Sequence, residues 1–223
     1  MQNNLIVNAT LAAMLLTSTT FATIVVKESP VKSAVRKGTA KAVTYTVDPA
    51  QSAINWNAKK VTGKHDGTVK MAKGQLTVDG NKLTGGTFVA DMTTMRDIDK
   101  GESNPFNERL VNHLRSEDFF GVEKYPTATF KITDVKPIAN AKAGEPNYTV
   151  SGDLTIKDIT KPQTFPATVN INGNVAQATA KMVVNRLEYD IKYRAAIIGT
   201  AADKIIDDTF SLDLKIVANK ASM

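Results

Sequence analysis

Cysteine is absent from the 223-residue chain, and aromatic residues (6%) and histidines (two) are scarce. Without cysteine there is no disulfide, no thiol nucleophile and no cysteine-ligated zinc or iron–sulfur cluster. The two histidines, His65 and His113, lack the H-x-x-x-H spacing of a zinc site. The G-x-S-x-G nucleophile elbow, the phosphate loop and the G-x-G-x-x-G fingerprint are missing as well. We therefore expect neither an enzyme nor a bound metal or cofactor.

One acidic segment looks like the start of a calcium-binding loop. Asp97, Asp99 and Glu102 have the spacing of such a loop, but Glu102 stands where the pattern requires glycine. The segment is better interpreted as a solvated acidic turn.

The positive charge of the chain is concentrated outside its long C-terminal part. The formal net charge is +6, and residues 27–41 hold five basic residues against Glu28 alone. Residues 42–223 therefore carry a net charge of only +2. Nucleic-acid binding usually needs a basic stripe on the folded domain, so we expect no nucleic-acid partner.

The first 26 residues carry no charged side chain and are mostly apolar from residue 5 onward. Thr20 and Ala22 are small residues at the spacing of an export cleavage site, which predicts an export signal over residues 1–26 and a periplasmic location. A retained membrane anchor is the alternative, although Asn8 and several threonines interrupt the apolar run. An ordinary buried helix is a third interpretation. Residues 27–42 lack periodicity and predict a basic flexible linker.

From Val43 onward, apolar and polar residues alternate, as in half-buried antiparallel strands. Phe210, Leu212, Leu214 and Ile216 show the pattern clearly, and so do the even-numbered residues from Ala176 to Val184. Gly-containing turns separate the runs, and we expect hairpin connections at residues 79–81 and 172–174, at Lys73-Gly74 and at Gly85-Gly86. Eight to ten short strands predict an all-β barrel or sandwich.

Two segments break the alternation. Asn104 is a good helix cap and Pro105 a good first residue. Phe106, Leu110 and Leu114 would then share the apolar face of a short amphipathic helix that ends near Arg115 and covers one end of a barrel. The second irregular stretch spans residues 186–207.

A barrel of about eight strands is wide enough to be filled by its own side chains or to hold one slender ligand. Small residues in the inward parity leave room, among them Ala58, Ala90, Ala178 and Ala180. Composition alone does not decide between a filled and a hollow barrel.

Several blocks of the sequence resemble the YceI-like family in the family's order. The segment HLRSEDFFGVEKYPTATF (residues 113–130) resembles the family's HL-x-S-x-DFF…YP…F hallmark. Further similar blocks are YTVDPAQSAINW, YTVSGDLTIKDITKPQTFPATV, VNRLEYDIKY and IIDDTFSLDLKIVA. The resemblance covers about residues 44–218, and we expect the YceI-like domain to span residues 43–219. Gly121, Asn185 and Ala201-Ala202 depart from the family's usual residues, in loops.

The resemblance implies a lipocalin-like antiparallel barrel of about eight strands. Such a barrel binds a polyisoprenoid or related lipid and catalyses no reaction on it. Storage or transport of this lipid in the cell envelope would be its function. We expect the tail to contact Trp56, Phe88, Met92, Leu110, Leu114, Phe119, Phe130, Phe165, Ala178, Ala180 and Ile191. We expect the head group to contact Lys64, His65, Arg109, His113 and Arg115.

Two other functions compete with this one. A closed barrel without a ligand would be a structural or interaction protein. An enzyme acting on a lipid would need a polar cluster inside the barrel, for which Tyr189, Asp190 and Tyr193 are the candidates. Exposed strand edges could pair between two copies of the chain, so a homodimer is an alternative that nothing in the sequence requires.

Overall fold

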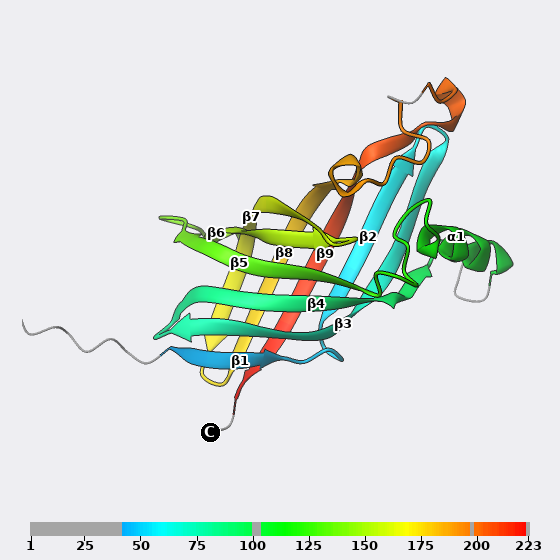
Figure 1. The fold of residues 1–223 in the computed structure, drawn as a ribbon. Coiled ribbons are helices and arrows are strands. Elements are labelled where there is room, and N and C mark those ends of the chain that lie inside the picture. Colours follow the sequence, from blue (N-terminus) through cyan, green and yellow to red (C-terminus); the bar gives the residue numbers. More distant parts are fainter. Residues whose placement is uncertain (1–41, 100–103, 197–198, 222–223) are drawn as a thin grey trace, which may run out of the picture. The chain divides into compact units, whose positions relative to one another are not determined.

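The computed structural model describes residues 42–99, 104–196 and 199–221. Most of these residues belong to long antiparallel strands, with one α-helix and two 3-10 turns (Figure 1). The predicted export signal, and the predicted linker up to residue 41, lie outside the described residues. No helix among the described residues is long and apolar enough to cross a membrane.

The elements follow one another along the chain as follows. The strands before the helix are β1 (Val43–Val47), β2 (Ala53–Lys60), β3 (Gly63–Asp79) and β4 (Lys82–Asp97), and the helix is α1 (Pro105–Arg115). After it come β5 (Thr127–Pro137), β6 (Tyr148–Ile156), β7 (Ile159–Asn172), β8 (Val175–Asn185), η1 (Arg186–Tyr189), η3 (Ala202–Lys204) and β9 (Ile206–Lys220).

The sheet closes into a barrel through the pairing of β3 with β4. Nine strands fill eight positions, because β1 and β2 lie one after the other between the two long strands β3 and β9. Residues 206–215 of β9 pair with β2, and residues 218–220 pair with β1. The expected all-β antiparallel barrel of about eight strands is thus confirmed.

Two of the four expected hairpin connections are correct, and two are wrong. Gly80 and Gly173 lie with positive φ in the turns of the β3–β4 and β7–β8 hairpins. Gly74, however, lies within β3, and Gly85-Gly86 lies within β4. Both places are next to irregularities in the β3–β4 register. These glycines therefore belong to bends in continuous strands, a role that glycine commonly has in barrels.

The register irregularities reverse which residues face inward. On β3, Val69 and Met71 line the interior before the shift at Met71/Lys73, and the even-numbered Leu76 lines it afterwards. On β4, Phe88, Ala90 and Met92 line the interior, followed by the odd-numbered Met95. An extra residue in one strand moves all later side chains to the other face. The barrel thereby curves while its interior stays apolar.

Helix α1 begins and ends where the sequence predicts. The Asn104 side chain accepts a hydrogen bond from the backbone N–H of Phe106 at 3.0 Å, and Pro105 is the first helical residue. The predicted apolar face is correct for Leu114, which lines the barrel interior, and wrong for Phe106, which is 62% exposed. The fully buried helix residues are Asn107 and Val111. The helix is therefore rotated from the expected face, because it packs mainly on the end of β4.

Candidate functional site

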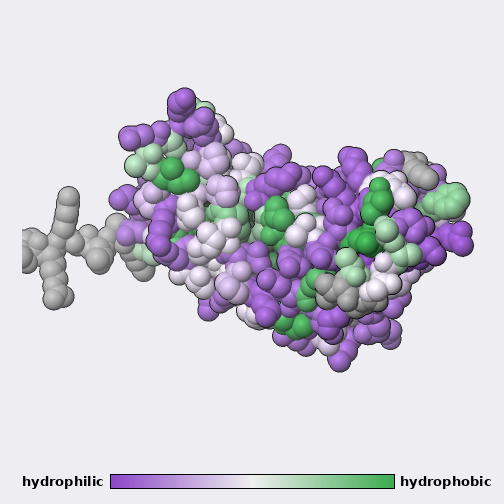
Figure 2. All heavy atoms as spheres, turned by 90° about the horizontal axis from the view of Figure 1, so that it is seen from above, coloured by the Kyte–Doolittle hydropathy of each residue, from purple (hydrophilic) through white to green (hydrophobic). Residues whose placement is uncertain are grey.

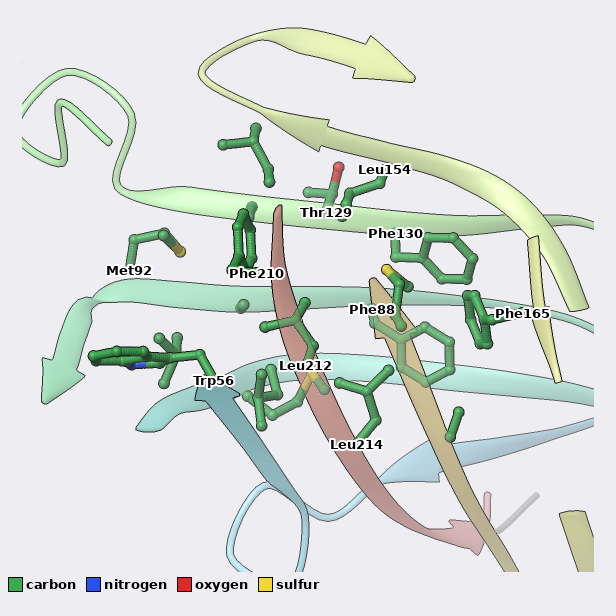
Figure 3. A pocket seen from close by; sticks show the side chains of 18 of the residues that line it. Trp56, Phe88, Met92, Thr129, Phe130, Leu154, Phe165, Phe210, Leu212 and Leu214 are labelled. Carbon is green, nitrogen blue, oxygen red and sulfur yellow. The ribbon is translucent and has the colours of Figure 1, made fainter. Parts of the chain in front are cut away.

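The barrel encloses an apolar cavity with about 1510 Å³ of empty space, part of which is open to solvent. Its wall combines the inward faces of eight strands, β2 to β9, with residues of the α1 region (Figure 3). The polar residues among those that line it are Thr129, Thr179, Arg186, Asp207 and Thr209. Ligand pockets are lined mainly by apolar side chains with a few polar groups, and this wall has that composition.

The cavity wall contains ten of the eleven residues predicted to contact a lipid tail. They are Trp56, Phe88, Met92, Leu114, Phe119, Phe130, Phe165, Ala178, Ala180 and Ile191. Leu110 does not line the cavity and is half-buried on α1. That these residues contact a ligand stays a prediction. Other wall residues, such as Val69 and Met71, are missing from the prediction, although their alternation with exposed Lys70 marks one face of β3.

The cavity wall combines aromatic and small side chains. Phe130 and Phe165 pack against each other at 5.4 Å between ring centroids, beside Phe88 (Figure 3). On β8, Ala178 and Ala180 line the wall. Their register partners on the neighbouring strand β9 are Ile216 and Leu214. Alanine side chains occupy little volume, which leaves space for the cavity inside the barrel.

The chain that follows α1 closes one end of the cavity. Leu114 on the helix and Phe119 and Phe120 in the following turn all line the cavity. The Arg115 guanidinium donates hydrogen bonds to the backbone carbonyls of Thr93 (2.6 Å) and Met95 (2.9 Å), which ties the helix to β4. The sequence-based expectation that the helix covers a barrel end is confirmed in this respect.

Arg186 fixes the irregular segment between β8 and β9. Its guanidinium donates to the backbone carbonyls of Ile191 (2.7 Å), Tyr193 (3.0 Å), Ile206 (2.9 Å) and Asp207 (2.9 Å). Burial lowers its pKa, and the carboxylates of Asp208 and Asp207 oppose that shift. A guanidinium remains charged in proteins. Arg186 is therefore a buried clamp, a role that sequence reasoning missed because each of its hydrogen-bond partners is a backbone oxygen.

The five residues predicted to bind a head group do not line the cavity. Lys64 forms an ion pair with Asp66 at 2.9 Å, and Arg109 is exposed on α1. His113 contacts Asp118 at 2.9 Å and meets the rings of Phe119 and Tyr193 edge-on. With Arg115 bound to β4, these side chains serve mainly to connect elements, and a head-group role for them stays a prediction.

His65 belongs to a group of acidic residues at the edge of the barrel. Its Nδ1 lies 2.6 Å from Asp99 Oδ2, and the Asp99 backbone N–H donates to Asp97 Oδ1 at 3.0 Å. Possible ligand atoms of His65, Asp97 and Asp99 all lie within 4.8 Å of one another. Burial raises the pKa of Asp97; the Asp99 backbone N–H opposes this, and the Asp99 carboxylate adds to it. Because these groups already satisfy one another, the arrangement is a polar network that fixes the end of β4.

Tyr189, Asp190 and Tyr193 do not form a catalytic cluster in the cavity. None of the three lines it. Tyr189 is fully buried, with Gln163 donating to its hydroxyl at 3.3 Å, whereas Asp190 forms an ion pair with Lys192. The Tyr193 ring packs on His113 and Phe119. Each of the three therefore has a structural partner.

An antiparallel barrel closed around a long apolar cavity defines the lipocalin-like class of single-domain barrels. The particular family follows from the sequence. The family model described as the YceI-like domain matches residues 45–218, and the chain belongs to this family.

Known relatives agree with this assignment. A UPF0312 protein of Pseudomonas putida strain W619 is 33% identical over 139 residues, which cover 61% of this chain and 67% of that protein. A UPF0312 protein of Staphylococcus aureus strain USA300 is 32% identical over 167 residues, covering 69% and 85%.

Two solved structures share the fold. Burkholderia cenocepacia BcnA superposes with a TM-score of 0.60 at 22% identity, covering 78% of this chain and 99% of that one. A polyisoprenoid binding domain from Saccharophagus degradans, implicated in plant cell wall breakdown, superposes with a TM-score of 0.54 at 13% identity, covering 80% and 99%.

Proposed function

We propose that this protein binds one long-chain amphiphile, a polyisoprenoid or a related lipid, with its tail inside the barrel. The observation that carries this proposal is the cavity itself, whose wall is apolar apart from five polar residues. Burial of a hydrocarbon chain stabilises a complex by about 0.8 kcal/mol per CH₂. A tail of a few dozen carbons then outweighs the cost of association. The polyisoprenoid binding domain with the same fold supports this ligand class.

The protein binds its ligand without changing it. Arg186, the buried cation of the wall, is engaged by backbone carbonyls, and the tyrosines considered for catalysis lie outside the cavity. Lipid storage or transport in the cell envelope, after export directed by residues 1–26, is the role that fits such a barrel. N-terminal sequencing of the protein from a periplasmic fraction tests the export step.

The first test is native mass spectrometry of the purified full chain, followed by organic extraction and identification of what is released. A stoichiometric long-chain lipid, recovered chemically unchanged after incubation with the protein, is the expected result. A stoichiometric lipid that is converted during incubation would contradict the proposal that the protein binds its ligand without catalysing a reaction.

A second test uses Trp56, the single tryptophan of the chain, which lines the cavity. Titration of the delipidated protein with a polyprenol, a quinone or a fatty acid should change Trp56 fluorescence saturably. The Trp56→Phe variant is the control for signal that does not arise from the cavity. A protein that is empty as purified and takes up none of these ligands would instead favour the closed-barrel interaction protein.

A further inference from the structure

The cavity approaches the surface of the molecule at the start of β9. A surface hollow lined by Ala196 and residues 205–209 shares Ile206, Asp207 and Thr209 with the cavity wall. The cavity and the hollow are therefore separated by little more than the start of β9. What surrounds it decides where a ligand can enter or leave.

The β2–β3 hairpin lies next to the start of β9. The backbone N–H of Val61 donates to the carbonyl of Ile205 at 3.2 Å, and Lys60 pairs with Ile206 in the sheet register. Figure 1 shows the hairpin end and the segment before β9 side by side, at one end of the barrel. We call the two segments, residues 59–64 and 201–205, the hairpin tip.

The hairpin tip combines exposed apolar and basic side chains. All residues from Lys59 to Lys64 are exposed, and Val61 is 63% exposed. In the facing segment, Ala201 and Ala202 are exposed. Across both segments four lysines stand against Asp203. Lys64 is paired with Asp66 at 2.9 Å, so Lys59, Lys60 and Lys204 carry the remaining positive charge of the tip. In Figure 2 hydrophilic atoms cover most of the face that is seen, and hydrophobic atoms reach the surface in several separate places.

We propose that the hairpin tip docks on the surface of an anionic lipid bilayer, with Val61 inserted among the head groups and the lysines against lipid phosphates. Apolar side chains flanked by lysines are the pattern that binds such interfaces. The positive charge of Lys59, Lys60 and Lys204 at the tip is complementary to an anionic leaflet. The purpose of docking, transfer of a tail between bilayer and cavity, rests on the proposed function. The surface itself does not depend on that function.

The absence of cysteine makes a local test simple. In the full chain, Val61→Cys is labelled with the environment-sensitive fluorophore NBD and mixed with vesicles of phosphatidylcholine containing 30% phosphatidylglycerol. The matched control is Val175→Cys, the first residue of β8 after the β7–β8 turn, at the opposite end of the barrel and also exposed in the wild type (36%). A local probe is necessary, because the apolar residues 5–26 are expected to bind lipid by themselves.

The expected result is a blue shift and brightening of NBD at position 61 and no change at position 175. Lys59→Gln with Lys60→Gln should weaken the response at position 61 on the order of 10- to 30-fold in lipid concentration. The control pair Lys82→Gln with Lys220→Gln, exposed at the opposite end, should leave it unchanged. Vesicles of pure phosphatidylcholine should give a much weaker response.

Three outcomes would overturn the proposal: no NBD response at position 61, an equal response at position 175, or a response that does not depend on anionic lipid. If NBD at position 61 gives no response to vesicles and a benzophenone label at the same position crosslinks to another protein, the tip is a protein-binding surface instead. Lipid uptake by the delipidated protein is measured separately, so docking without uptake would reject the carrier function and leave the docking surface standing.

Discussion

The indole of Trp56 lies against the backbone of Gly67, its partner on the neighbouring strand β3. A methyl group on Gly67 would overlap the Trp56 ring and the backbone carbonyl of Arg96. The absence of a side chain at position 67 therefore gives the aromatic ring its place in the cavity wall.

Gly67→Ala should destabilise the protein by about 1–3 kcal/mol, because an overpacked site must move backbone or ring. It should also change the fluorescence of Trp56. The matched control is Gly85→Ala, where the nearest atoms to an added Cβ are 3.9 Å away. Urea unfolding monitored by circular dichroism measures both variants. Equal stability of the two variants would show that the close approach at Gly67 is relaxed in solution.

Replacing Ala178 or Ala180 with Trp should fill part of the cavity and reduce lipid retention at least tenfold, with the barrel still folded. Both alanines line the cavity from β8. Val183→Trp is the control, because Val183 is on the same strand but 57% exposed. Native mass spectrometry after expression compares the lipid-bound fractions. Unchanged retention in both cavity variants would mean that these residues do not face the ligand.

Arg186→Leu should lower the free energy of unfolding by about 3–5 kcal/mol, because it leaves buried carbonyl groups without donors. Arg186→Lys should lie between this variant and the wild type, since one ammonium cannot reach all four carbonyls in the geometry of the planar guanidinium. Lys192→Leu, at an exposed ion pair nearby, should change stability by no more than about 0.5 kcal/mol. A lysine variant as stable as the wild type would contradict the clamp.

Asp97→Asn should stabilise the protein at pH 7. Burial raises the pKa of Asp97 above 3.8, so the folded state favours the protonated carboxyl. Its contribution to stability is complete below pH 3.8 and is lost as the pH rises through the folded-state pKa. The advantage of the asparagine variant should therefore disappear near pH 3.

Urea midpoints at the two pH values measure this difference. Asp213→Asn, which removes an exposed carboxylate near Lys181, is the control and should not stabilise the protein. An Asp97→Asn variant that is less stable than the wild type at pH 7 would show that the Asp97 carboxylate is needed in its ionised form.

The strand and helix assignments came from local chemistry. The alternation in Phe210, Leu212, Leu214 and Ile216 was sufficient to place these residues inside, where the structure has them. Asn104 and Pro105 marked the start of α1 correctly, because capping depends on the neighbouring backbone alone. The helix face was wrong for Phe106, because a helix turns its face toward whichever strands it packs on.

The alternation and the helix cap by themselves determined antiparallel strands with one apolar face and the position of the helix, because period and capping depend on neighbouring residues. They left a barrel and a sandwich as alternatives, and the barrel was implied by the resemblance to the YceI-like family. Only the tertiary structure decided that the barrel is hollow, because the space left inside depends on the summed volumes of side chains from eight strands. It also decided the parity of β3 and β4, which reverses at irregularities that depend on the partner strand. The clamp at Arg186 likewise depends on strand pairing. The carbonyls of Ile206 and Asp207 lie 20 and 21 residues along the chain and meet the guanidinium only when β9 pairs with β8.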